Sequence, residues 1–471
     1  MRWWALAAVT LGTFMTYLDN NVANVALPTI QRDLGLTISG LEWITSSYIL
    51  VFAGLMLVGG RLADLFGARR VFLSGLAVFT IASLAAGLST GAGTLIAARA
   101  VQGVGAALLT PTALSLIAQI FPDPAERARA VGIWSSAGAL SMALGPVTGG
   151  FISENLHWGW IYLINVPIGA ATFALGFRMV RPSFSRVRRS LDVPGLAASA
   201  IALFALTYAL IEGSSAGWTS PEILAAFGVS GLAAASFLLI ESRAAEPMID
   251  LSLFRARVFS GGLATMGVWS FGVFGIYFFS ALWLQNVLGF SPTEAGGAFV
   301  PMALVMAVVA ILSQRISAVL GVGVSVAIGL ALMGASIYLL SGVGADGTYL
   351  DVLPLFLMYG VGGGMLVSLT AVVLNGMPTG RSGIASGVLN VSREVFGLLG
   401  ITVLGAILTQ RQGSSHQPPL TAFLDAYQFT LVIAGVIVLL GIPVALTTLR
   451  SRRQATPEQP QTAEMAVSSS N

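Results

Sequence analysis

Long apolar stretches follow one another along almost the whole chain and restrict the folds that it can adopt. About fourteen stretches of roughly 20 residues lie between residues 3 and 448, and each is long enough to cross the hydrocarbon core of a membrane as a helix. Only 9% of the residues are charged, against about 25% in a soluble protein. The sequence therefore predicts an all-α polytopic membrane protein with fourteen transmembrane helices.

The arginines test this number of spans and predict an orientation. With fourteen spans both termini lie on one side, and 19 of the 23 basic residues, all of them arginine, fall on that side. Only Arg32 and Arg411 fall on the other side, while Arg99 and Arg393 lie within spans. Basic residues gather in cytoplasmic loops. We therefore expect a multi-pass protein of the bacterial cytoplasmic membrane with both termini in the cytoplasm.

Polar loops divide the chain into four predicted regions. The residues from 450 to 471 are rich in Ser, Gln, Pro and Glu, a composition that is typical of disorder. The regions are a six-helix bundle at 1–180, two inserted linker helices with flanking cytoplasmic loops at 181–258, a second six-helix bundle at 259–449, and a disordered cytoplasmic tail at 450–471.

A weak internal repeat suggests that the two bundles are pseudo-symmetric. The tetrapeptide Arg61-Leu62-Ala63-Asp64 before Gly67 has an echo in Arg315-Ile316-Ser317-Ala318 before Gly321, and each follows the second helix of its bundle. The echo lacks the acid. Repeated halves with a site between them are common in secondary transporters.

One compact charged block stands between the second and third apolar stretches. It reads Gly60-Arg61-Leu62-Ala63-Asp64-Leu65-Phe66-Gly67-Ala68-Arg69-Arg70. The arginines can fix topology and meet anionic lipids, and the glycines permit a tight turn. Topology does not explain Asp64, which can accept arginine hydrogen bonds or face a helix N-terminus of the other half as a latch. The candidate gating residues are Gly60, Asp64, Gly67, Arg69 and Arg70.

Four further motifs lie in order along the first six stretches. They are LDNNVANVALP at 18–28, RAVQGVGAA at 99–107, GPVTGG at 145–150 and WGWIYLINVP at 158–167. Together with the charged block, they resemble the motifs of the fourteen-helix drug:proton antiporter branch of the major facilitator superfamily. The sequence departs from the branch pattern at Asn21, Glu42, Ser141 and Gly159. The resemblance implies a proton-coupled antiporter that exports hydrophobic or cationic small molecules, such as drugs, antibiotics or dyes, by alternating access.

Asp19 and Arg99 are the first candidates for proton coupling. Asp19 lies about 13 Å of helix rise before Pro28, deep in the membrane, where burial favours the neutral form of a carboxyl group. Arginine stays protonated, so Arg99 can stabilise the ionised acid but cannot carry the proton itself. The alternative is a fixed structural ion pair, or an Asp19 that is hydrogen-bonded to Asn20 or Asn24.

A second charged pair, Arg393-Glu394, lies inside the stretch at 384–410. Adjacent residues of a helix do not face each other, so we expect the two side chains to have different partners. Glu394 is the second candidate proton carrier, with Arg393 beside it. A buried structural pair with another helix is the alternative.

The candidate substrate-binding residues are Asp19, Asn24, Glu42 and Tyr48. Glu42 begins the second stretch, where we expect a solvated side chain that stabilises a helix N-terminus, with coupling as the alternative. Tyr48 belongs to a set of aromatic residues that could line a drug pocket or form the interfacial belt of a membrane protein. The other members of that set are Trp43, Trp160, Trp269, Trp283 and Phe278.

The stretch at 127–153 carries small residues at every fourth position, which let membrane helices approach closely. Pro146 removes a backbone donor and bends the helix. We therefore take Gly145, Pro146, Gly149 and Gly150 as candidate residues of a hinge between the halves, with plain tight packing as the alternative. Crosslinks between 127–153 and 384–410 are expected to block transport.

The sequence predicts a transporter and no enzymatic activity. The chain has no nucleotide-binding loop and no nucleic-acid motif, and it has no cysteine and only two histidines. We therefore expect no metal and no cofactor, and partners limited to a small-molecule substrate, protons and the lipid bilayer. The oligomeric state stays open. The alternative functions are a proton-coupled importer of a small nutrient and a non-transporting membrane scaffold or sensor.

Overall fold

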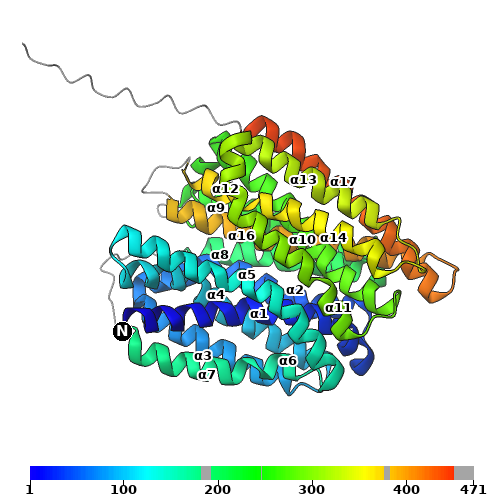
Figure 1. Ribbon diagram of the computed structural model, residues 1–471, viewed down its shortest axis with the longest axis horizontal. Coiled ribbons are helices and arrows are strands. Elements are labelled where there is room, and N and C mark those ends of the chain that lie inside the picture. Colours follow the sequence, from blue (N-terminus) through cyan, green and yellow to red (C-terminus); the bar gives the residue numbers. More distant parts are fainter. Residues whose placement is uncertain (182–191, 245–246, 376–381, 450–471) are drawn as a thin grey trace, which may run out of the picture.

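The computed structural model describes residues 1–181, 192–244, 247–375 and 382–449. The predicted tail at 450–471 and most of the first linker loop lie outside these residues. Within them every regular element is a helix, and the long helices run roughly parallel to one another (Figure 1). The predicted all-α class is therefore confirmed.

The first bundle is built by the helices of the first 179 residues. In it, α1 packs on α5 and α7, while α4 packs on α2 and α3. Figure 1 shows this bundle as the lower half of the molecule, in blue to blue-green. Its helices are α1 (Arg2–Leu34), α2 (Ile38–Phe66), α3 (Ala68–Gly87), α4 (Ala92–Ile120), α5 (Pro124–Asn155), α6 (Trp160–Leu163) and α7 (Asn165–Met179).

The second bundle lies above the first in Figure 1 and follows the hairpin described below. In it, α10 packs on α16 and α17, while α13 packs on α14 and α17. Its helices are α10 (Arg257–Asn286), α11 (Pro292–Ala298), α12 (Val300–Leu320), α13 (Val322–Leu340), α14 (Tyr349–Met365), α15 (Val367–Asn375), α16 (Ser382–Gly413) and α17 (Pro419–Thr448).

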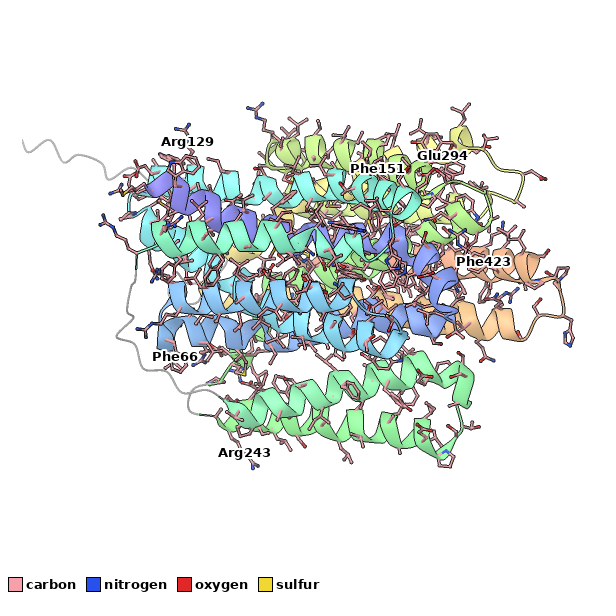
Figure 2. All side chains as sticks on the ribbon, turned by 90° about the horizontal axis from the view of Figure 1, so that it is seen from below. Phe66, Arg129, Phe151, Arg243, Glu294 and Phe423 are labelled. Atoms are coloured by element: carbon pink, nitrogen blue, oxygen red, sulfur yellow. The ribbon has the colours of Figure 1, made fainter. Side chains whose placement is uncertain are left out.

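Two helices between the bundles form a hairpin of their own. They are α8 (Val193–Ala216) and α9 (Pro221–Arg243), followed by the short helix η1 (Leu251–Arg255). Figure 2 shows the hairpin set beside the main body. α8 contacts α2 of the first bundle and α16 of the second, so the hairpin touches both bundles through one helix.

Thirteen helical segments of the described residues are long and apolar enough to cross a membrane. Three of them join two consecutive helices, namely α6 with α7, α11 with α12, and α14 with α15. The remaining long helix is α1, whose polar run Asp19-Asn20-Asn21 lowers its hydropathy. Because α1 lies alongside α5 and α7 in the bundle, it accounts for the fourteenth predicted span.

Helix starts follow from local sequence signals. The Asp123 side chain accepts hydrogen bonds from the first backbone N–H groups of α5, and Pro124 occupies the first helical position. Ser291 and Glu294 form a reciprocal capping box at α11, as Thr348 and Asp351 do at α14. These caps satisfy orphan donors at helix ends that lie near the membrane surface.

The molecule has two distinct ends. In Figure 2, Phe66, Arg129 and Arg243 gather at one end, while Glu294 and Phe423 lie toward the other. The first end contains the turn between α2 and α3, and we call it the basic end. The N-terminus also lies there (Figure 1).

The turn at the basic end corrects one prediction. The block at 60–70 is not a loop throughout, because α2 continues to Phe66 and Gly60 lies within the helix. Only Gly67 occupies the turn, with φ 88°, a conformation that favours glycine. Gly321, between α12 and α13, has φ 82°. The sequence echo is therefore matched by the same backbone geometry in both bundles.

Candidate functional site

A polar cluster surrounds Asp19 in the interior of the first bundle. Asp19 on α1 forms an ion pair with Arg99 on α4, and both side chains are completely buried. Gln102 Nε2 donates to Asp19 Oδ1 at 3.1 Å, and Asn165 Nδ2 donates to the same oxygen at 2.7 Å. An ionised carboxylate can accept all three donors, so this arrangement matches the deprotonated acid.

Arg99 is held on several sides. Its Nη1 donates to Gln102 Oε1 at 2.9 Å, and its Nε donates to the Ile44 carbonyl at 3.3 Å. The guanidinium carbon lies 4.4 Å from the ring centre of Tyr48 and 5.6 Å from that of Tyr162. Such stacking over aromatic faces stabilises a desolvated cation. Arg99 Nη2 has no hydrogen-bond partner among the described residues.

The predicted pairing of Asp19 with Arg99 is thus present, but the predicted asparagine partners are wrong. Asn165 binds Asp19, whereas Asn24 contributes to a cavity on another face of α1. Gln102 and Asn165 lay inside the motifs noted in the sequence, yet neither was a predicted site residue. Their signal was a carboxamide placed within an otherwise apolar helix, which requires a buried partner.

A central cavity of about 140 Å³ lies between the two bundles. Asp19 does not line it, so in this conformation the predicted direct contact between Asp19 and substrate has no support. Asn24 Oδ1 and Trp269 Nε1 are buried without a hydrogen-bond partner in the described structure. The lining residues are Thr16, Tyr17, Asn20, Asn21, Asn24, Tyr48, Phe52, Thr110, Met142, Trp269, Val273, Phe274, Tyr277, Met306, Arg393 and Glu394.

Arg393 and Glu394 form their own ion pair on the cavity wall. Arg393 Nε and Nη2 donate to Glu394 Oε1 at 3.1 Å and 2.7 Å. The prediction that these neighbours have different partners is therefore wrong, because the long arginine side chain folds back over the adjacent carboxylate. The arginine side chain is 25% exposed and the glutamate side chain 4%. The pair brings one positive and one negative charge to the cavity.

Tyr48 connects the buried cluster to the cavity. It lines the central cavity, and its ring lies against the guanidinium of Arg99. Trp269 also lines the cavity, whereas Trp283 and Phe278 are buried in the second bundle. Of the aromatic residues that were candidates for a drug pocket, Tyr48 and Trp269 therefore line the space between the bundles, whereas Trp283 and Phe278 do not.

The glycine motif of α5 has two faces. A Cβ atom at Gly145 or Gly149 would collide with α1, within the first bundle. A Cβ atom at Gly150 would instead collide with the Pro292 carbonyl of α11, and one at Gly296 of α11 with the Pro146 carbonyl. The motif therefore binds α5 to its own bundle and to the other bundle at adjacent positions.

The contacts of α5 across the interface bear on the proposed crosslinks. The expected crosslinks join α5 to the stretch at 384–410, whereas α5 contacts α11 and α12 of the second bundle, and α16 contacts α2. Since α1 also contacts α10 and α11, the bundles meet along several helix pairs, of which α5 with α11 and α2 with α16 are two. Crosslinks that test closure need to join α5 to α11 or α2 to α16.

The charged block contributes to the basic end in several ways. Arg69 donates to the Phe177 carbonyl of α7 and stacks on the Phe177 ring, with 5.0 Å to its centre. Arg61 donates to the Pro247 carbonyl at 2.9 Å, which ties α2 to the segment after α9. Arg70 is exposed. Asp64 lines a second cavity with Arg61, and its predicted latch stays a prediction.

This second cavity opens the path between the basic end and the centre. It has a volume of about 400 Å³ and shares Tyr17 and Thr110 with the central cavity. Gly60 of α2 and Gly387 of α16 both line it. At the other end, Gly150 packs closely against α11. A further cavity of about 870 Å³ lies at that end and is lined by residues of both bundles and of α8, among them Trp43, Glu212 and Thr409. The space between the bundles is therefore hollowed at both ends.

Glu42 departs from its predicted environment. It is 1% exposed rather than solvated, and its Oε1 has no hydrogen-bond partner among the described residues. It does not line the central cavity. Its carboxyl group instead lies directly against Gly405 of α16, at the seam between the bundles.

Three resistance proteins of Streptomyces species are similar in sequence to most of this chain. A methylenomycin A resistance protein of Streptomyces coelicolor is 37% identical over 412 residues, covering 87% of this chain and 86% of the relative. A tetracenomycin C resistance and export protein of Streptomyces glaucescens is 35% identical, covering 87% of this chain and 77% of the relative. A puromycin resistance protein of Streptomyces alboniger is 32% identical, covering 97% and 93%.

Solved structures share the fold at low identity. A peptide transporter of the POT type, crystallised with sulfate, aligns with a TM-score of 0.69 and 16% identity, over 95% of this chain and 96% of that one. A bacterial Spinster homologue in an inward-facing conformation aligns with a TM-score of 0.66 over 96% and 99%. The Major Facilitator Superfamily model matches residues 9–401. The chain therefore belongs to the Major Facilitator Superfamily.

Proposed function

We propose that this protein exports small amphiphilic molecules, hydrophobic or cationic, in exchange for protons. The observation that carries the proposal is the adjacency of two sites, a cavity between the bundles and a sealed Asp19–Arg99 cluster separated from it by Tyr48. The names of the relatives, which are resistance and export proteins, support the direction of transport.

The basic end faces the cytoplasm in this proposal. Arginine-rich ends of membrane helices are retained on the cytoplasmic side, and both the N-terminus and the arginines of the charged block lie at the basic end. The cavity of about 400 Å³ at that end would then admit substrate from the cytoplasm or the inner leaflet.

The central cavity suits molecules with an apolar body and a few polar groups. Aromatic side chains such as Trp269, Phe274 and Tyr277 supply apolar contact area. The unpaired Asn24 Oδ1 offers an acceptor and the unpaired Trp269 Nε1 offers a donor. A bound molecule that satisfied both groups would remove the free-energy cost of leaving them buried without partners.

Asp19 would carry the exchanged proton. The three donors around it match the ionised acid, which is the state required after proton release toward the cytoplasm. When Asp19 takes up a proton on the outer side, its attraction for Arg99 weakens, because the charge partner becomes neutral. The guanidinium could then shift against Tyr48, and this movement would reach the cavity wall.

The exchange has a defined energy supply. One charge crossing 100 mV provides about 2.3 kcal/mol, which sustains roughly a fifty-fold gradient of a neutral compound for each proton. Exchange of a monovalent cation for one proton would be electroneutral and would depend on the pH difference alone. The dependence on membrane potential therefore reports the coupling ratio.

Proteoliposomes energised by a pH gradient test this function. A panel of lipophilic cations and neutral antibiotics is added, and proton release is followed in the wild type and in Asp19→Asn. We expect release in the wild type and its loss in the variant. Glu126→Gln is the matched control, because it also replaces a carboxylate paired with an arginine by a carboxamide, but at an exposed site. Proton release that persists in Asp19→Asn would show that another residue carries the proton. Movement of the added compound in the same direction as the protons would indicate an importer.

A further inference from the structure

Glu42 is a buried acid that the proposed exchange does not use. It lies near the start of α2, toward the end opposite the basic end, and only 1% of it is exposed. Its Oε1 is buried without a hydrogen-bond partner in the described part of the chain. An ionised carboxylate without a partner is costly to bury, whereas a protonated one is much less so.

The carboxyl group of Glu42 lies at the seam between α2 and α16. A Cβ atom at Gly405 of α16 would collide with Glu42 Oε1 and Cδ. Glu42 belongs to the first bundle and Gly405 to the second, so the acid is enclosed only while α2 is closed against α16. If the bundles separate at this end, water reaches the carboxyl group and the cost of its charge falls.

The surroundings of Glu42 do not compensate a negative charge. Glu212 of α8 acts on it electrostatically with the same sign. Glu212 itself accepts from Trp43 Nε1 at 2.8 Å, which holds it next to α2. Among the helices packed against α2, none contributes a hydrogen bond to Glu42 Oε1. Their charged side chains are Arg2, Asp19, Arg32 and Asp33 on α1, Arg69 and Arg70 on α3, Arg99 on α4, Glu212 on α8, and Arg393, Glu394 and Arg411 on α16.

The positive groups of that set are engaged or remote. Arg99 is paired with Asp19, and Arg393 with Glu394. Arg411 is paired with Asp425 at 3.0 Å. The arginines of α3 lie at the basic end. Arg2 is paired with Glu126, and Arg32 donates to the Pro28 carbonyl at 3.3 Å and to Thr29 Oγ1 at 3.4 Å. Among the described residues of these helices, no cation is therefore available to replace a proton on Glu42 while the seam is closed.

We propose that Glu42 is a second proton-binding site, which must be protonated for α2 to close against α16. The proton is taken from the outer phase as the seam closes and is returned to the same phase as the seam opens. Glu42 therefore gates the outer side without adding to the number of protons exchanged. This proposal rests on the alternating access of the proposed function, and it gives α8 a role, since Glu212 disfavours the ionised form of Glu42.

Spin-label distances test the gate directly. The chain has no cysteine, so Thr94→Cys and Ser414→Cys provide two unique labels on exposed residues of opposite bundles at the outer end. Double electron–electron resonance is measured in nanodiscs without substrate between pH 5 and pH 9. For the parent protein we expect a short distance at low pH and a growing longer-distance population as the pH rises.

Three variants in this background separate Glu42 from other acids. Glu42→Gln mimics the protonated form, and we expect it to keep the short distance at every pH. Glu212→Gln removes the neighbouring negative charge, which disfavours the ionised form of Glu42. Opening should therefore begin at a lower pH than in the parent protein. Glu154→Gln is the matched control, because Glu154 of α5 accepts from the Thr293 backbone N–H of α11 at 3.1 Å, which also joins the two bundles, but Glu154 is exposed. It should follow the parent.

A second kind of variant tests the gate without changing Glu42 itself. Gly405→Ala places a methyl group where the Glu42 carboxyl group lies, and it should lengthen the distance at low pH. A distance in Glu42→Gln that still changes with pH as in the parent would overturn the gate, as would a parent distance that ignores pH. Neither of these results would bear on the proton-release assay with Asp19→Asn. That assay tests the proposed exchange and does not test the gate at Glu42.

Discussion

Two of the arginine–carboxylate pairs in this protein, one in each bundle, occupy contrasting environments. In the first bundle, Asp19 and Arg99 come from different helices and are sealed from the cavity, with further donors from Gln102 and Asn165. In the second bundle, Arg393 and Glu394 are neighbours on one helix and lie on the cavity wall. In the proposed exchange, the first pair would hold a proton away from substrate, and the second would set the charge that a substrate meets.

The largest expected effect is on the sealed pair. Arg99→Gln leaves Asp19 buried without its cation, and breaking a buried pair costs about 3–5 kcal/mol in the free energy of unfolding. We expect a strong loss of thermal stability in detergent and of protein yield. The double variant Asp19→Asn with Arg99→Gln should recover much of the stability, since no lone charge remains, but not the proton release. Equal stability of the single and double variants would contradict the pairing.

An intermediate effect is expected at the pair on the cavity wall, Arg393 and Glu394. Arg393→Gln removes the positive charge from the cavity wall and leaves Glu394 uncompensated there. Binding of a monovalent cationic dye should tighten by roughly tenfold, about 1.4 kcal/mol, while binding of an uncharged analogue changes little. Fluorescence titration of both ligands measures this. Parallel changes for the two ligands would show that the pair does not set the charge preference.

The smallest effect is expected at a single unpaired donor. Trp269→Phe keeps an aromatic ring in the cavity but removes the Nε1–H group, which has no partner in the described structure. Substrates that accept this hydrogen bond should bind more weakly by about 1 kcal/mol, and purely apolar ones should not. Isothermal titration with a matched pair of ligands separates the two cases. Weaker binding of both would indicate a packing role.

The sequence predicted the fold and the first charged pair well, for physical reasons. Spans of about 20 apolar residues have few alternatives to a transmembrane helix. A carboxylate in such a span requires a partner, and Arg99 was the available cation in the first bundle. The α1 helix was counted correctly because its polar residues follow a long apolar run, although its hydropathy alone falls below that of the other spans.

The errors arose where the outcome depends on packing between helices. Glu42 looked like a solvated helix start, but the approach of Gly405 encloses it. Arg393 and Glu394 looked divergent, but a flexible arginine side chain can fold back on its neighbour. Asn165 was overlooked because its partner on α1 is 146 residues away in the chain. None of these contacts has a periodicity that a linear sequence could reveal.

The matched turns at Gly67 and Gly321 bear on the ancestry of the two bundles. Both glycines adopt positive φ between the second and third long helices of their bundle, yet the acid of the first turn, Asp64, has only Ala318 as its counterpart. A duplicated gene would produce this result if the backbone path persisted while the side chains diverged. On that view, the two bundles inherited one shape and then specialised, so that only the first bundle carries an acid before this turn.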